Sequence, residues 1–132
     1  MTYYEATFSV IGKPQGKGSW RSVRGGRIIP VGGAKLKAWE HAVRLAASRN
    51  APDEPLDCPV ALHLTFWLPC PKKPRFNRPA VKPDWDKLAR STCDAMTGVI
   101  YKDDARIVRA SVDLLYCSTE HAGVRIKVRA LD

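Results

Sequence analysis

Residues 82–107 read Lys82-Pro83-Asp84-Trp85-Asp86-Lys87-Leu88-Ala89-Arg90-Ser91-Thr92-Cys93-Asp94-Ala95-Met96-Thr97-Gly98-Val99-Ile100-Tyr101-Lys102-Asp103-Asp104-Ala105-Arg106-Ile107. This stretch holds five of the 13 acidic residues in a chain of 132 residues whose formal net charge is +9. A basic protein that concentrates carboxylates in one place is expected to use them to bind a cation. Mg²⁺ and Mn²⁺ prefer oxygen ligands, and a phosphodiester is the natural substrate for such a site in a basic chain. The candidate site therefore comprises Asp84, Asp86, Asp94, Asp103 and Asp104.

The same stretch predicts a helix over residues 85–97. Pro83 disfavours helix at the residue before it, Asp84 is a good N-cap, and Gly98 is a good residue to end the helix. Helical spacing predicts a buried face made of Trp85, Leu88, Ala89, Thr92, Cys93 and Met96. Asp86, Arg90 and Asp94 are four residues apart and are expected on the opposite side.

The predicted helix start allows several of these carboxylates to converge. With Asp84 in the non-helical cap position, its side chain and that of Asp86 can turn toward one point. The pair Asp103-Asp104 follows a short connection and could return to the same end of the helix. The alternative is that Asp84 only caps the backbone and that Asp103-Asp104 is a solvated turn. The combination of all of them in a basic chain favours the cation site.

The composition predicts one soluble, cytoplasmic domain over residues 1–132. The chain is long enough for a hydrophobic core, has no apolar run of membrane-spanning length, and begins without the apolar segment of a signal peptide. The four cysteines are widely spaced and are expected to be free thiols, and the three histidines form no recognisable catalytic or metal-binding pattern. His63 is interpreted as structural.

Positive charge is concentrated in the first part of the chain. Residues 1–50 hold nine Lys or Arg and two Glu, a net of +7, whereas residues 51–132 hold thirteen Lys or Arg and eleven Asp or Glu, a net of +2. This distribution favours nucleic acid over an acidic protein as the partner, although charge alone does not separate the two.

Alternating apolar residues predict strands at 3–10, 60–68, 108–116 and 124–130, and a scaffold helix is expected over 34–49. The last two strands are predicted to form an antiparallel hairpin with an apolar inner face and a basic outer face. The alternative role of the basic outer face is only to keep the sheet soluble.

Two basic segments are the candidate DNA contacts. The first, residues 13–27, is glycine-rich and contains Trp20. The second, residues 72–78, is stiffened by proline and contains Phe76. The alternatives are a basic loop with no specific role for the first and a solvated connector for the second. The residues expected to contact phosphates are Lys13, Lys17, Arg21, Arg24 and Arg27, and then Lys72, Lys73, Arg75, Arg78 and Lys82.

The central stretch resembles the RusA family of Holliday junction resolvases, which occur in bacteria and their prophages. The family pattern is approximately Lys-Pro-Asp-x-Asp-Asn-Leu-x-Lys, then Asp-Ala-Leu-x-Gly, then Asp-Asp and a hydrophobic strand. The matching segments here are residues 82–90, 94–98 and 103–107, and Gly12-Lys13-Pro14 resembles the N-terminal loop of the family.

The resemblance implies a metal-dependent endonuclease that resolves four-way DNA junctions in recombination and repair. Asp84, Asp86 and Asp104 would be the catalytic carboxylates that bind Mg²⁺, with Mn²⁺ as an alternative, and Asp103 would be an accessory acid. Arg90 stands at the position of a functional lysine, and Lys87 stands where the family usually has asparagine. Both departures put the rate, the metal preference and the junction selectivity in question more than the reaction class.

The implied fold is α+β, a small mixed sheet with two helices that acts as an intertwined homodimer. A dimer also has a physical reason, because a nearly two-fold four-way junction must be cut on two opposed strands. Two other functions remain open from the sequence. One is a junction- or fork-binding module that no longer cuts, and the other is a general nuclease for flaps or other branched nucleic acids, including RNA.

Overall fold

The described residues form six strands, two α-helices and two short 3₁₀ helices. The computed structural model describes residues 3–18, 20–22, 25–30 and 33–132. In chain order the elements are β1 (Glu5–Ile11), β2 (Trp20–Ser22), β3 (Ile28–Pro30), α1 (Gly33–Arg49), β4 (Val60–Pro69), α2 (Trp85–Met96), η1 (Asp104–Arg106), β5 (Ile107–Cys117), η2 (Thr119–His121) and β6 (Gly123–Ala130).

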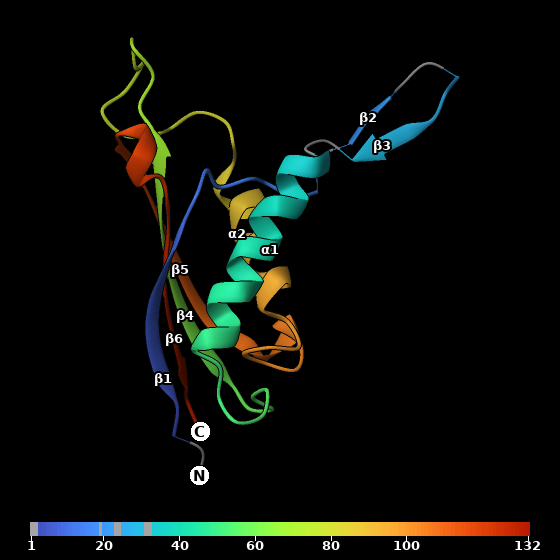
Figure 1. The fold of residues 1–132 in the computed structure, drawn as a ribbon, viewed down its shortest axis with the longest axis vertical. Helices are drawn as coiled ribbons and strands as arrows, with labels where there is room; N and C mark the ends of the chain where they lie inside the picture. The colour runs from blue at the N-terminus through green and yellow to red at the C-terminus, as the bar shows by residue number, and fades with distance from the viewer. Residues whose placement is uncertain (1–2, 19, 23–24, 31–32) are drawn as a thin grey trace.

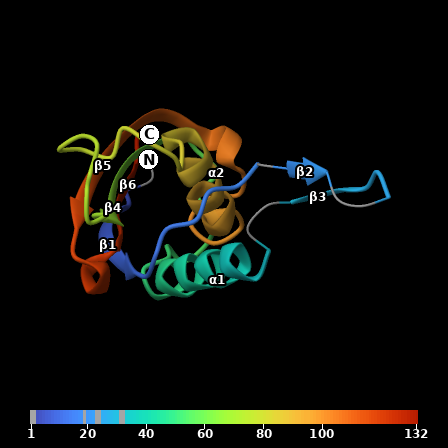
Figure 2. The ribbon, with the colours of Figure 1, turned by 90° about the horizontal axis from the view of Figure 1, so that it is seen from above.

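Four of the strands form one mixed sheet in the order β1-β6-β4-β5. β4 pairs with β5 in parallel and with β6 antiparallel, and β1 pairs with β6 antiparallel. Both helices pack on the same face of this sheet and leave the other face open (Figures 1 and 2). The prediction of a single α+β domain with a small mixed sheet and two helices is therefore confirmed. In the described part of the chain, neither helix is long and apolar enough to cross a membrane.

The predicted hairpin between the last two strands is wrong. β4 lies between β5 and β6. Its residues are buried on both sides of the sheet, as expected for a central strand. Parallel strands need a crossover connection, and α2 provides it between β4 and β5. β6 then pairs with the other edge of β4.

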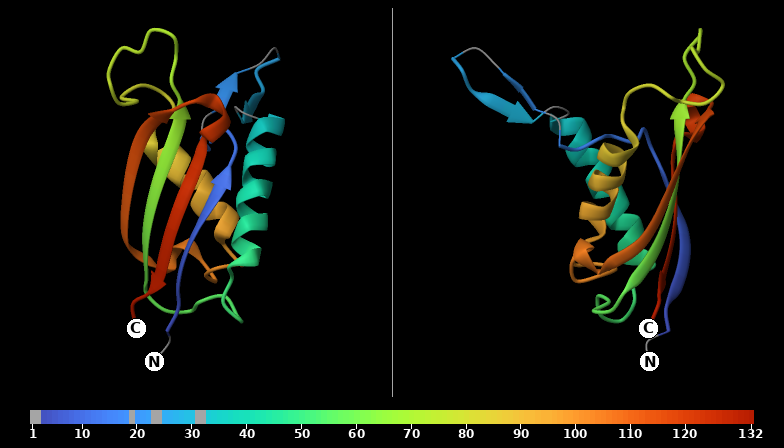
Figure 3. Two further views of the ribbon diagram at one scale, coloured as in Figure 1. Left: turned by 60° about the vertical axis from the view of Figure 1, so that its left-hand side comes forward. Right: turned by 180° about the vertical axis from the view of Figure 1, so that it is seen from behind.

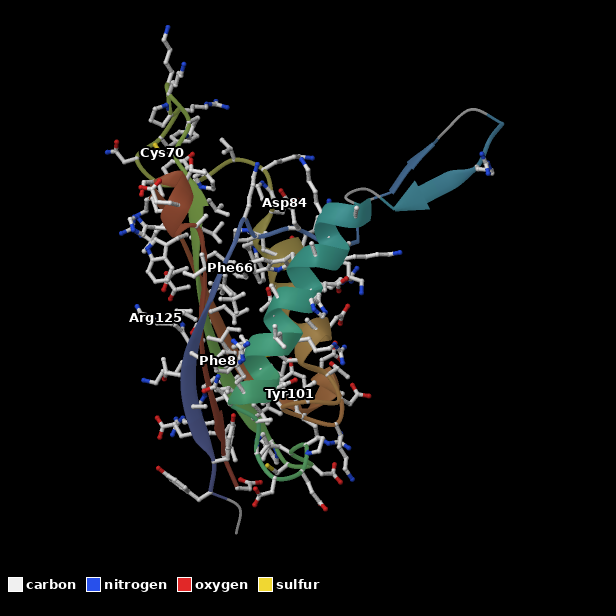
Figure 4. The ribbon with its side chains drawn as sticks, in the orientation of Figure 1. Phe8, Phe66, Cys70, Asp84, Tyr101 and Arg125 are labelled. Carbon is white, nitrogen blue, oxygen red and sulfur yellow. The ribbon has the colours of Figure 1, made fainter. Side chains whose placement is uncertain are left out.

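The core lies between the sheet and the helices. Figure 4 shows Phe8 and Phe66 pointing from the sheet toward α1. The predicted scaffold role of the first helix is consistent with its buried face, which consists of Leu36, Trp39, Val43 and Ala47. Tyr101, which follows α2, is fully buried, and its hydroxyl donates a hydrogen bond of 2.8 Å to the backbone oxygen of Cys93. The four cysteines are free thiols, as predicted.

The buried face of α2 differs from the predicted one, because Trp85, Ala89 and Cys93 are not fully buried whereas Ser91 and Ala95 are. Trp85 is 59% exposed, whereas Ser91 is fully buried. The buried residues are Leu88, Ser91, Thr92, Ala95 and Met96. Ser91 is buried because the segment after β1 packs on it, and its hydroxyl donates a 2.6 Å hydrogen bond to the Gln15 backbone oxygen. Helical periodicity alone did not reveal this second packing partner.

Part of the first basic segment is a hairpin instead of a loop. β2 and β3 pair antiparallel and extend away from the sheet and the helices (Figures 1 and 3). Arg27 is exposed near the turn of this hairpin. Arg24 lies outside the described residues, and so does the side chain of Arg21.

Candidate active site

Asp84 occupies the N-cap of α2, but its side chain does not cap the helix. Its backbone is extended, with φ −70° and ψ 145°, and its carboxylate makes no capping hydrogen bond. The predicted helix start is therefore confirmed, while the alternative role as a side-chain cap is not. The side chain is 45% exposed and lies 4.0 Å from the Lys87 ammonium. Its oxygens are thus available to an external cation.

Asp86 lies in the first turn of α2 and is exposed. Its carboxylate makes no hydrogen bond or ion pair with the residues that the structure describes. Asp84 and Asp86 both line a groove of about 590 Å³, together with Lys82, Trp85 and Leu114 and the backbone that leads into the helix. The groove therefore combines two available carboxylates with an exposed aromatic ring and a lysine.

The segment before the β2–β3 hairpin is docked along α2 beside these carboxylates. The backbone N–H of Lys17 donates a 3.0 Å hydrogen bond to the Lys87 oxygen. A Cβ added at Gly16 would approach the Lys87 Cβ to 3.0 Å, and one at Gly18, whose φ is +99°, would lie 2.6 Å from a guanidinium nitrogen of Arg90. The two glycines therefore allow this segment to lie against the helix.

Lys17 is bound to two carboxylates. Its ammonium lies 3.1 Å from Asp94 and 3.3 Å from Glu40 on α1. The hydrogen bond to Asp94 is the main cause that raises the pKa of Lys17 above its ordinary value. Lys17 therefore joins the segment to both helices, and its charge is compensated within the subunit. This arrangement does not favour the phosphate contact that the sequence predicted for it.

Asp103 and Asp104 lie near the opposite end of α2 from Asp84 and Asp86. Asp103 accepts a 2.9 Å hydrogen bond from the backbone N–H of Ala105, which lowers the pKa of its carboxyl. The pKa of Asp104 is raised, first by burial, then by its hydrogen bond with Asp103 and by the negative charge of Asp94. Asp104 therefore lies beside Asp94 and not beside the helix start.

The turn that carries Asp103 and Asp104 is held by the segment before β4. Leu56 donates a 2.8 Å backbone hydrogen bond to Ile100 and accepts one of 2.9 Å from Lys102. Asp57 lies 3.4 Å from the Lys102 ammonium and 2.9 Å from Nε of Arg106. These contacts fix the turn at the C-terminal end of α2, where Tyr101 lies; Figure 4 shows Asp84 at the other end.

The prediction that Asp103-Asp104 returns to the helix start is therefore wrong within one chain. Asp86 and Asp94 are eight residues apart on α2, a rise of about 12 Å. Oxygens that share one Mg²⁺ each lie about 2.0–2.1 Å from the ion, so Asp104 beside Asp94 is too distant to join Asp84 and Asp86. Among the described residues, no group of three or more His, Cys, Asp or Glu could hold a metal ion.

Replacement of Asp104 with asparagine is expected to stabilise the free protein at neutral pH. Because the folded-state pKa of Asp104 is raised, its ionised carboxylate destabilises the fold above that pKa. The gain in unfolding free energy should be at most about 1 kcal/mol, because the group is exposed to solvent. This gain in stability should disappear as the pH falls through the folded-state pKa of Asp104 toward the ordinary value of 3.8. Melting temperatures of the native protein and the variant, measured at pH 7 and at low pH, test this.

Asp103→Asn provides the contrasting variant. Since the Asp103 pKa is lowered in the folded protein, its stabilising contribution is present at neutral pH and lost as the pH falls through the folded pKa. Asp103→Asn should therefore lower the melting temperature at pH 7. Equal changes of the same sign in the melting temperatures of both variants at pH 7 would contradict the opposite pKa shifts of Asp103 and Asp104.

The cations that accompany the carboxylates fall into two groups. Arg90 is exposed one turn after Asp86 on α2, beside Gly18. The proline-rich loop after β4 extends beyond the end of the sheet (Figure 1). Its Arg75 guanidinium lies 5.1 Å from the ring centre of Phe76. The exposed basic residues near this loop and the groove are Lys13, Lys72, Lys73, Arg75, Arg78 and Lys82.

Comparison with known proteins identifies relatives over most of the chain. A family model described as "Endodeoxyribonuclease RusA" matches residues 12–129. The chain is 30% identical over 135 residues to "Uncharacterized protein YqaN" of Bacillus subtilis (strain 168). That alignment covers 92% of this chain and 94% of the relative. The family match includes the docked segment, both helices, all five aspartates and the strands β4 and β5, and it covers β6 up to Arg129, whereas β1 precedes it.

Proposed function

The chain belongs to the RusA endodeoxyribonuclease family, and from this premise we propose that it is a metal-dependent enzyme that resolves four-way (Holliday) junctions. The single observation that carries the proposal is the pair Asp84 and Asp86. Both carboxylates lie at the start of α2 in one groove, and among the described residues Asp84 has only the 4.0 Å approach of Lys87 while Asp86 has no hydrogen bond or ion pair. A capping or structural role would not require this arrangement.

The donor set suits a hard divalent cation. Asp84 and Asp86 would hold it, with Asp104 as the third carboxylate, since Mg²⁺ and Mn²⁺ prefer carboxylate oxygen. A bound ion supplies a water of lowered pKa and stabilises negative charge on the phosphate and on the leaving oxygen. Lys87 and Arg90 lie on the same helix and would attract the scissile phosphate, with Arg90 able to form two parallel hydrogen bonds to it.

We further propose that the functional unit is a two-fold homodimer that completes each site. Within one subunit, Asp104 lies beside Asp94, which is about 12 Å along α2 from Asp86. A partner could instead place its Asp103-Asp104 turn against the groove of the first subunit. Two such composite sites would face the two strands that a junction resolvase must cut.

Exposed apolar side chains at the groove and on the edge strand β5 support the dimer proposal. Trp85 is 59% exposed beside Asp84 and Asp86, and Val108 is 63% exposed on the edge strand β5. Leu114 of β5 is only half buried and lines the groove. Large apolar surfaces that remain uncovered in a monomer commonly mark protein interfaces. An interface here would bring a second subunit to the carboxylates.

The basic loop after β4 and the residues around the groove are proposed to hold the junction arms. Their contacts would be to phosphates, which position the DNA without reading its sequence. Lys13 and Lys82 border the groove region, while the cations of the loop lie farther out. Recognition would then depend on the shape of the junction more than on its bases.

The native protein is expected to cut four-way DNA in Mg²⁺ much faster than it cuts duplex, flap or RNA substrates of matched sequence. The reason is that a two-fold pair of sites fits two opposed strands only at a four-way junction. Labelled substrates incubated with limiting protein and analysed on denaturing gels measure the rates. Equal rates on flaps and junctions would instead identify a general nuclease, and full junction binding without incision in Mg²⁺ or Mn²⁺ would identify a binding module.

A further inference from the structure

The face of the sheet that the helices leave open carries a cluster of cations. Strand alternation brings Arg109 of β5 and three residues of β6 to this face, and all four are exposed. Figure 4 shows Arg125 on the side of the sheet opposite the helices and Asp84. We define the open-face cluster as Arg109, Arg125, Lys127 and Arg129.

Three members of the cluster surround a shallow hollow between three strands. Ala61 of β4 is the register partner of both Arg109 and Arg129. Since neighbouring strands are about 4.8 Å apart, the backbones of the two arginines flank Ala61 at a separation of about 10 Å. The methyl group of Ala61 leaves a hollow of about 210 Å³, whose lining also includes Lys127, His63 and Ser111. Three cations therefore surround a site with polar groups in its floor.

The floor of the hollow is held by hydrogen bonds. Nδ1 of His63 is hydrogen-bonded to the Ser111 hydroxyl, and its Nε2 lies 3.2 Å from the Thr65 hydroxyl and 3.4 Å from the Asp113 carboxylate. The predicted structural interpretation of His63 is consistent with this network. Beside it, the Arg125 guanidinium lies 5.3 Å from the ring centre of Trp67.

The charge balance of this face favours a polyanion. Strand register places two acidic residues on it, Glu5 opposite Arg129 and Asp113 opposite Thr65. Four cations therefore face two carboxylates, and one of these lies close to His63. A second copy of the chain docked face to face would bring two such clusters together, which like-charge repulsion opposes.

Spacing along β6 points to a regularly repeating anion. Arg125, Lys127 and Arg129 are two residues apart in turn, so their backbones span about 13 Å. Phosphates of one DNA strand follow at about 3.4 Å along the helix axis, so this row is long enough to face several of them. An acidic protein would need carboxylates arranged to match, whereas a phosphate backbone always presents such a row.

We infer that the open face of the sheet binds the phosphate backbone of duplex DNA, at a site separate from the carboxylates on the helix side. This second contact goes beyond junction cleavage and does not depend on it. It would give each subunit a grip on DNA that needs neither a junction nor a divalent cation. Arg109, Lys127 and Arg129 around the hollow would carry the binding.

The test compares two triple variants that each remove three positive charges. Arg109→Gln/Lys127→Gln/Arg129→Gln changes the open face, and Lys35→Gln/Lys37→Gln/Arg44→Gln changes exposed positions of α1 as the matched control. Binding to a linear duplex without a junction is measured by fluorescence anisotropy over a series of salt concentrations, without divalent cations. Melting curves verify that both variants fold.

The open-face variant should lose three phosphate contacts. The slope of the logarithm of its duplex-binding constant against the logarithm of the salt concentration should therefore be shallower by about 2.7, because each contact contributes about 0.9. The slope of the control should differ from the native slope by no more than about 0.9, the contribution of one phosphate contact. Arg109→Gln alone should change the slope by about 0.9 and serves if the triple variant does not fold. Equal slopes in the open-face variant and the control, whether both native or both reduced, would overturn the inference.

Junction cleavage at low salt separates this inference from the proposed function. The open-face variant should still cut a four-way junction at low salt, because its carboxylates are unchanged. Failure of the native protein to cut would overturn the resolvase proposal and leave the duplex-binding result unaffected.

Discussion

Replacement of Asp86 with asparagine is expected to abolish cleavage of four-way DNA and to leave junction binding intact or tighter. The amide keeps the shape of the side chain but removes the negative charge that would hold Mg²⁺. Loss of outer-shell partners of metal ligands alone costs about 10–100-fold in activity or metal affinity, so loss of a direct ligand should exceed about 100-fold. Binding should not weaken, because a carboxylate that repels the DNA phosphates is removed.

The measurement pairs a cleavage assay in Mg²⁺ with a binding assay on the same labelled junction without metal. Asp53→Asn is the matched control, since it removes the same charge from an exposed turn before β4. This control should cut at the native rate. An Asp86→Asn protein that cuts as fast as the control would show that Asp86 is not a metal ligand, and the site proposal would fail.

Two inactive variants are expected to recover activity when they are mixed. If each site combines Asp86 of one subunit with Asp104 of the partner subunit, a dimer of Asp86→Asn with Asp104→Asn has one site that carries both substitutions. Its other site is intact, because it takes Asp86 and Asp104 from the subunits in which each is native. Random exchange makes about half of the dimers mixed, so about a quarter of the native number of sites should return.

The recovered activity should have a distinctive product. A mixed dimer with one working site should nick one strand of the junction but should not make the paired cuts of the native protein. Labelling each strand in turn distinguishes nicks from paired cuts on a denaturing gel. Differently tagged subunits and native mass spectrometry verify that mixed dimers have formed.

The control for complementation is a mixture of Asp84→Asn and Asp86→Asn. These two residues lie at the same end of α2 in one subunit, so each site of the mixed dimer carries one of the two substitutions. No activity should return. Recovery in this control, or its absence from verified dimers of Asp86→Asn with Asp104→Asn, would contradict sites composed of two subunits.

The proposed composite site would reconcile the sequence pattern with the fold. The helix start and the Asp103-Asp104 turn lie close in sequence, but in one subunit Asp104 lies beside Asp94, about 12 Å along α2 from Asp86. Contacts of Leu56 and Asp57 hold the turn at the far end of the helix. Residues from opposite ends of an element commonly meet in a two-fold dimer, because the same surface patch serves both subunits.

The sequence by itself determined the local features of this protein. It predicted α2 and the non-helical Asp84 at its start, because a proline, a cap residue and a terminal glycine act within a few residues of one another. It also predicted the α+β class, the scaffold helix and the family, whose pattern lies in the stretch that carries the five aspartates. Periodicity and capping depend on near neighbours, so the order of residues is enough to reveal them.

Only the tertiary structure decided how distant segments meet. It placed β4 between β5 and β6, bound Lys17 to Asp94 and Glu40, and left Asp104 away from Asp86. Each of these outcomes depends on which surfaces of distant segments bury one another, and several arrangements satisfy the same alternation of apolar residues. Local order therefore specified the carboxylates and the helix that carries them, whereas their separation within one subunit follows from packing that spans the whole chain.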